Sequence, residues 1–134
     1  MSDQELLEFG KKYMGQVEGF IKHNQYRLVD IKQNCCVMEA DIREECLNYY
    51  GLVHGGFIFG LADTAAGILA RATGRKAVTL NSHIEYLHAA RGGKIKVVAS
   101  AIKTGRNISV YEVSIYDDQD VMVAKAILDY FYIN

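Results

Sequence analysis

The sequence lacks the features that mark several large classes of protein. Its formal net charge is −1 and its basic residues form no cluster, which argues against nucleic acid as a partner. No apolar run reaches the length that spans a membrane, because Asp63 interrupts the longest one. The first residues do not combine a basic stretch with an apolar one, so we expect neither a secretory signal nor a membrane partner.

Cysteine is scarce, and its arrangement argues against disulfides and metal binding. The three cysteines, Cys35, Cys36 and Cys46, have no CxxC spacing, so we expect free thiols in a cytoplasmic protein. The four histidines also show no spacing typical of metal ligands: His23, His54, His83 and His88. We therefore expect no metal and no separate cofactor.

The residues that are present favour a folded domain of the α+β class. Half of the 134 residues are hydrophobic, so the chain can bury a core, and we expect a single domain over residues 1–134. A capping box from Ser2 to Glu5 predicts an N-terminal helix, and apolar residues at helical spacing carry it to about His23 and Asn24. A second, strongly apolar helix should follow Gly55 and end near residues 72–74. Alternation of apolar residues and turn-like breaks predict strands over residues 26–32, 35–42, 77–87, 94–103, 107–117 and 121–133.

The arrangement of these elements is also partly predictable. Short breaks between the last four strands indicate an antiparallel meander. One long helix with five or six antiparallel strands predicts a sheet wrapped around that helix. The last strand is apolar on both faces, and its second face would need a cover, so we expect an oligomer. One of these faces carries Ala124, Ala126, Leu128, Tyr130 and Tyr132, and the other carries Val123, Ile127, Phe131 and Ile133.

Residues 48–63 carry the strongest functional signal: Asn-Tyr-Tyr-Gly-Leu-Val-His-Gly-Gly-Phe-Ile-Phe-Gly-Leu-Ala-Asp. A polar, glycine-bearing loop leads into the apolar helix, and the helix opens on Gly55 and Gly56. Unpaired N–H groups at the positive end of a helix suit a carbonyl oxygen that becomes an oxyanion. The same helix contains a carboxylate, Asp63, which is costly in a core unless it has a partner or a task.

The spacing within this segment also limits how Gly55 and Asp63 can act together. Asp63 follows Gly55 by eight residues, which places it roughly 12 Å further along the helix axis. No small reacting group could touch the helix start and this carboxylate in the same subunit. If both groups take part in one reaction, the carboxylate must come from a second chain.

The segment resembles the hotdog-fold acyl-CoA thioesterases of the phenylacetate-degradation (PaaI-like) type. That family carries an Asn-x-x-Gly-x-x-His-Gly-Gly loop followed by an Ala-Asp-Thr-Ala-like run, and this chain matches it without a gap from Asn48 to Ala65. The resemblance implies hydrolysis of an acyl-CoA to a carboxylic acid and coenzyme A, with coenzyme A arriving as part of the substrate. It also implies an active site at the interface of a homodimer, and commonly a homotetramer.

The resemblance further implies a role for individual residues. The catalytic set comprises Gly55, whose N–H would bind the thioester carbonyl, Asp63 as general base or nucleophile, Asn48 orienting the water, and His54 bracing the loop. Gly56 would allow close approach of the acyl group, and Thr79 matches a small hydroxyl residue near the site. The coenzyme A contacts would come from Tyr86, Arg91, Lys103, Gly105, Arg106 and Asn107. The family often has proline in the turn after the first long strand, whereas this chain reads Tyr-Leu-His-Ala-Ala at 86–90 and contains no proline.

Other interpretations of the same residues exist. Asp63 could be a structural carboxylate at a subunit contact, Asn48 could only shape a turn with Gly51, and His54 stands where a helix cap belongs. At the level of function, the alternatives are a non-catalytic acyl-CoA sensor and an enoyl-thioester hydratase. The sensor is disfavoured because both Asp63 and Asn48 are present. The hydratase is disfavoured because such enzymes pair Asp and His at a different spacing. The acyl group itself is not predictable.

Overall fold

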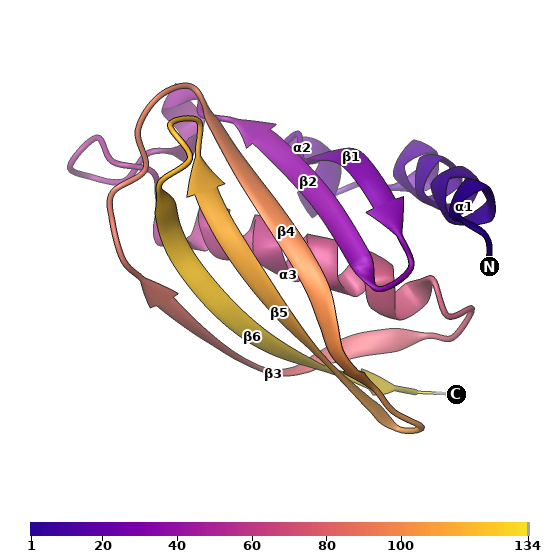
Figure 1. The fold of residues 1–134 in the computed structure, drawn as a ribbon. Coiled ribbons are helices and arrows are strands. Elements are labelled where there is room, and N and C mark those ends of the chain that lie inside the picture. Colours follow the sequence, from indigo (N-terminus) through magenta and orange to yellow (C-terminus); the bar gives the residue numbers. More distant parts are fainter. Residues whose placement is uncertain (134) are drawn as a thin grey trace.

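A computed structural model describes residues 1–133 and shows a six-stranded antiparallel sheet curved around one long helix (Figure 1). The helices are α1 (Asp3–Gln16), α2 (Phe20–His23) and α3 (Gly55–Arg71), with a short 3-10 turn, η1, at Glu44–Cys46. The strands are β1 (Arg27–Lys32), β2 (Cys35–Asp41), β3 (Ala77–Tyr86), β4 (Lys94–Thr104), β5 (Ile108–Asp117) and β6 (Met122–Tyr132). The predicted α+β hotdog architecture is confirmed, and each predicted strand boundary lies within one residue of the observed one.

The core lies between α3 and the concave face of the sheet. Small residues on α3, among them Ala62, Ala65 and Ala66, are fully buried and let the strands approach the helix closely. Alternate residues of the strands, such as Val97 and Val113, fill the other side of this layer. In the described residues 1–133, no helix is long and apolar enough to cross a bilayer.

The N-terminal helix is shorter than predicted. The capping box is present, because Ser2 Oγ accepts from the Glu5 N–H and the Glu5 carboxylate accepts from the Ser2 N–H. The helix ends at Gln16, however, and Phe20 belongs to the separate short helix α2. Gly19 lies between them with a φ of +66°, a left-handed conformation that an α-helix cannot contain.

The predicted meander is correct only for β4, β5 and β6. The strand order is β1-β2-β4-β5-β6-β3, so β3 lies at the edge beside β6, and β4 pairs with β2. The break at residues 91–93, which was interpreted as a turn between neighbouring strands, belongs to a segment that crosses the end of the sheet instead. Leu87 N–H donates to Val123 O of β6, and Gly93 O accepts from the Ile42 N–H beyond β2. Sequence alternation identifies a strand but does not identify its neighbours.

The convex face of the sheet carries exposed apolar residues, as predicted. Phe131 of β6 lies beside Val78 of β3 and Ile108 of β5, and all three are at least 40% exposed. Val123 was expected on the same face as Phe131, but it is fully buried. The pairing of β5 with β6 shifts register between Ile115 and Tyr116 and skips Val123, which interrupts the alternation of faces.

Candidate active site

The loop before α3 is shaped by Asn48. Its side-chain oxygen Oδ1 accepts from the N–H groups of Tyr50 and Leu52 at 2.9 and 3.1 Å, and Gly51 between them has a φ of +76°. The turn-forming interpretation of Asn48 is therefore confirmed. Among the described residues, the side-chain nitrogen Nδ2 has no acceptor, so it can still donate to a water or substrate. The role of Asn48 in orienting water stays a prediction.

His54 caps helix α3 and selects which N–H remains free. Its Nδ1 accepts from the Gly56 N–H at 2.8 Å, and its carbonyl accepts from Phe57 and Ile58. A neutral ring with Nδ1 as acceptor carries its proton on Nε2. The Gly55 N–H has no acceptor within residues 1–133, so it is the free donor at the positive end of the helix dipole.

Tyr86, at the end of β3, holds the start of α3. Its hydroxyl donates to Gly55 O at 2.8 Å, and a Cβ at Gly55 would lie 3.1 Å from the ring carbon Cζ. Burial raises the pKa of Tyr86, so the phenol remains a donor. Sequence reasoning placed Tyr86 only among the coenzyme A contacts and missed this contact. We call Asn48, His54, Gly55 and Tyr86 the amide half-site.

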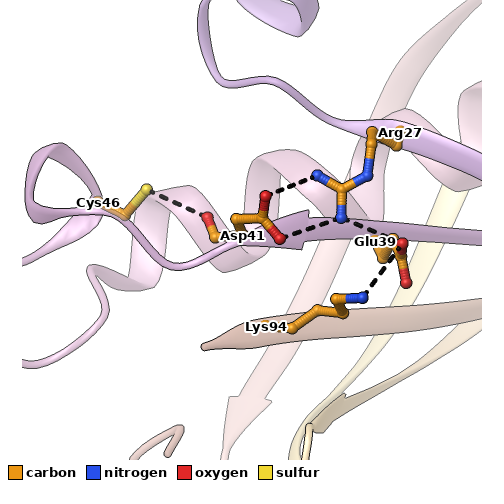
Figure 2. A network of polar contacts seen from close by, with 5 residues as sticks. All are labelled: Arg27, Glu39, Asp41, Cys46 and Lys94. Atoms are coloured by element: carbon orange, nitrogen blue, oxygen red, sulfur yellow. Dashed lines mark hydrogen bonds and ion pairs between the residues drawn. The ribbon is translucent and has the colours of Figure 1, made fainter. Parts of the chain in front are cut away.

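An ionic network fixes the base of the loop to the sheet (Figure 2). Arg27 of β1 binds both carboxylate oxygens of Asp41 at 3.1 Å and also binds Glu39, which Lys94 of β4 approaches at 3.5 Å. The Cys46 thiol points at Asp41 O at 3.8 Å, and the Cys46 carbonyl accepts from the His54 N–H at 2.8 Å. The network thus connects β1, β2 and β4 to the loop that carries the helix cap.

Asp63 lies two turns further along α3 and is held by hydroxyl groups from the sheet. Thr79 Oγ1 of β3 donates to Asp63 Oδ1 at 2.8 Å. The hydroxyl of Tyr130 of β6 lies 2.5 Å from the same Oδ1 and equally close to the Asp63 carbonyl oxygen. We call Asp63, Thr79 and Tyr130 the carboxylate half-site. Thr79 was predicted only as a hydroxyl residue near the site, and the structure shows that it contacts Asp63. Tyr130 was predicted only on an apolar face of the last strand.

In the sequence, only a general chemical rule could have pointed to a role for Tyr130. A buried phenol needs a partner for its hydroxyl, and Tyr130 was predicted on one of the two apolar faces of the last strand. The sequence does not show which partner that is, because 67 residues separate Tyr130 from Asp63.

The structure does not bring all predicted site residues together within one chain. The amide half-site and the segment leading to Arg91 lie at the N-terminal end of α3. The β4–β5 turn, with the other predicted coenzyme A contacts, lies at the opposite end of the sheet (Figure 1). There Arg75, just beyond the C-terminal end of α3, donates to Arg106 O at 2.7 Å. The residues of this turn that were predicted to contact coenzyme A are Lys103, Gly105, Arg106 and Asn107.

The architecture is the hotdog fold, and the sequence identifies a thioester hydrolase. The chain belongs to the thioesterase superfamily, whose sequence profile matches residues 50–124. This match includes His54, Gly55, Asp63 and Thr79 but stops before Tyr130.

Individual relatives and solved structures agree with this assignment. A protein named "Putative esterase" from Archaeoglobus fulgidus is 26% identical over 123 residues, which cover 91% of this chain and 80% of that protein. The E. coli PaaI protein, from the phenylacetic acid degradation operon, has the same fold with a TM-score of 0.91, at 21% identity over 100% of this chain and 97% of that one. The smu.793 protein of Streptococcus mutans, solved bound to acetyl CoA, has a TM-score of 0.81 at 29% identity over 89% and 94% of the two chains.

Proposed function

We propose that the protein hydrolyses acyl-CoA thioesters to carboxylic acids and coenzyme A, at a site formed by two subunits. The observation that carries the proposal is that α3 presents a free N–H at Gly55 and a carboxylate at Asp63, eight residues apart. Their separation of roughly 12 Å is too large for one thioester to reach both in the same chain. The acetyl-CoA complex of the S. mutans protein supports coenzyme A as the carrier.

The edge strand β3 offers the surface for a dimer. Within the described residues, β3 pairs only with β6, and its other side is unpaired over a ten-residue strand that exposes Val78 and Leu80. An exposed apolar edge of this length favours pairing with another strand. A second copy of β3, related by a two-fold axis, would add antiparallel to the first and continue the sheet.

This pairing would also join the two half-sites. Antiparallel pairing sets the Thr79 end of one β3 beside the Tyr86 end of the other. Because Thr79 holds Asp63 and Tyr86 holds Gly55, the carboxylate of one subunit approaches the free N–H of its partner. The β4–β5 turn lies at the Thr79 end, since Asn107 O accepts from the Tyr132 N–H and Tyr132 pairs with Ala77. The predicted coenzyme A contacts on Lys103–Asn107 would therefore meet those on Tyr86–Arg91 of the partner subunit.

In the proposed mechanism, the thioester carbonyl oxygen binds the Gly55 N–H, which stabilises the oxyanion by about 3 kcal/mol. Asp63 of the partner subunit takes a proton from water that Asn48 Nδ2 orients, or attacks the carbonyl itself, with water then hydrolysing the resulting anhydride. In either case an oxygen adds to the acyl carbon, the carbon–sulfur bond breaks, and coenzyme A leaves as a thiolate that takes up a proton. Arg91, Lys103 and Arg106 are suited to bind the phosphates of coenzyme A.

We further propose that two dimers associate through the convex face of the sheet. Val78, Ile108 and Phe131 form a continuous exposed apolar strip across β3, β5 and β6, which a second dimer would cover. A cytoplasmic location agrees with the three free cysteines.

Thiol release from a panel of aromatic, short and long acyl-CoAs tests the proposed reaction. Asp63→Asn keeps the shape of the side chain and removes its charge, so we expect the rate to fall about 10³-fold at unchanged oligomeric state. Asp30→Asn on β1, remote from both half-sites, is the matched control and should retain wild-type turnover. If wild-type protein bound coenzyme A tightly but hydrolysed none of these esters, the acyl-CoA sensor would replace the enzyme.

A further inference from the structure

We propose that Tyr130 is a positioning residue that, together with Thr79, fixes the Asp63 carboxylate by its Oδ1 atom and leaves Oδ2 to react. This inference rests on the proposed function and deepens it. Tyr130 lies outside the segment that matches the thioesterase superfamily, and its hydroxyl has no other task in the core.

The position of Tyr130 is set by its packing. The residue is 1% exposed, and its ring packs edge-on against Tyr111 at a centroid distance of 5.8 Å. The inward face of β6 aims the hydroxyl at α3, where it reaches both Oδ1 and the main-chain oxygen of Asp63. The phenol has one proton, which it shares between these two acceptor oxygens of Asp63.

Gly67 makes room for this contact. Gly67 lies one turn beyond Asp63, and a Cβ there would be 3.3 Å from the Tyr130 hydroxyl and 2.5 Å from Arg71 Nη1. The glycine thus allows a phenol and a guanidinium to share the surface of the helix beside the carboxylate. Arg71 is itself anchored, because its Nη2 donates to Ala77 O at 3.1 Å.

The two donors are unequally distributed over the carboxylate. Thr79 Oγ1 and the Tyr130 hydroxyl both approach Oδ1, whereas Oδ2 accepts no hydrogen bond from any residue in 1–133. A carboxylate that is held at one oxygen presents the other in a defined direction. Thr79 is exposed on the open edge strand, so the carboxylate that it holds lies next to the edge from which a partner subunit would bring the thioester.

Tyr130 acts through Asp63 rather than on the substrate. Desolvation, reinforced by the negative charge of Asp63, raises the pKa of Tyr130. The phenol therefore stays protonated and keeps donating to the carboxylate, so it does not serve as a base. Its burial beneath α3 also keeps it out of contact with a thioester.

The test compares Tyr130→Phe with Tyr132→Phe in the full-length protein, using the best acyl-CoA of the panel. Tyr132 lies on the same strand and face, and its buried hydroxyl bonds to Ser109 Oγ at 2.7 Å, remote from Asp63. We expect Tyr130→Phe to lower kcat at least about tenfold, as for a lost hydrogen bond to a charged group. KM should not change, because no contact with the substrate is removed. Tyr132→Phe should keep the wild-type kcat.

Thr79 supplies a second, independent variant. Thr79→Val removes the hydroxyl and should lower kcat with KM unchanged, whereas the conservative Thr79→Ser restores the hydroxyl and should recover most of that loss. A wild-type kcat in Tyr130→Phe would overturn the inference and leave the proposed function intact. If Tyr130→Phe lowered kcat, raised KM and dissociated the dimer together, the inference would also be overturned, since Tyr130 would then be only structural. A wild-type protein without turnover on any acyl-CoA would overturn the proposed function and this inference together.

Discussion

The two half-sites lie on the same helix but are built in different ways. The amide half-site is held mainly by local contacts, in which Asn48 and His54 bond to backbone groups two to four residues away. The carboxylate half-site is held by hydroxyls that the sheet brings from 16 and 67 residues away. The first is a backbone donor at a loop, and the second is a charge supported from the core. One chain therefore supplies both chemical groups but holds them too far apart to act on the same thioester.

Removing the donor of the amide half-site should have the largest effect. Gly55 is the first residue of α3, where proline fits the helix and removes the N–H, while its Cβ meets the Tyr86 ring as that of an alanine would. We expect Gly55→Pro to lower kcat about 10²- to 10³-fold, the loss typical of a missing oxyanion donor. Steady-state kinetics at matched oligomeric state would measure it.

Gly55→Ala is the control for this substitution because it keeps the N–H. Its Cβ would lie 3.1 Å from the Tyr86 ring, so a modest fall in rate is expected. Equal rates for the two variants would show that the Gly55 N–H does not act on the substrate.

Separating the half-sites by breaking the dimer should have the second-largest effect on turnover. Leu80 on the free edge strand β3 is 54% exposed, and a lysine there would oppose strand pairing. We expect Leu80→Lys to convert dimers to monomers in sedimentation velocity and to reduce turnover in proportion. Val29→Lys is the matched control, because Val29 is 50% exposed on β1 at the opposite edge of the sheet. A Leu80→Lys monomer with full turnover would contradict the shared site.

The smallest expected effect is a pH-dependent loss of folding stability, which depends on Asp117 at the end of β5. Desolvation acts to raise the pKa of Asp117, but donors from Val121, Gln119 and Arg91 outweigh it and hold this pKa below its usual value. A lowered pKa in the folded state stabilises the protein above the unfolded-state value, and this stability is lost as pH falls through the folded-state pKa. Thermal unfolding should therefore show a stability loss below about pH 4.

Asp117→Asn should lower Tm near neutral pH and flatten the acid dependence below that pH. Asp120→Asn in the same turn is the control, since its side chain makes no hydrogen bond within residues 1–133. If Asp117→Asn and the wild-type protein lost Tm equally on acidification, the lowered pKa of Asp117 would not contribute to stability.

The same comparison explains how far sequence reasoning reached. The amide half-site could be predicted because Asn48, His54 and Gly55 form one contiguous motif whose chemistry depends on local backbone geometry. The family resemblance placed Thr79 near the site but did not pair it with Asp63, and Tyr130 was missed. Tertiary packing decides which hydroxyl meets which carboxylate. The strand boundaries followed from alternation, but the place of β3 beside β6 did not, since the Arg-Gly-Gly break at 91–93 resembles a hairpin turn. Gly19 likewise broke a helix whose apolar spacing continued on both sides.

The most direct test of the shared site is complementation between two inactive subunits. Gly55→Pro retains Asp63, and Asp63→Asn retains the Gly55 donor, so a mixed dimer contains one intact site. Unfolding and refolding the two variants together should restore about a quarter of wild-type turnover, since half of the dimers are mixed and each has one working site of two. A mixture that forms mixed dimers yet remains as inactive as its parents would show that the two groups do not act across the interface.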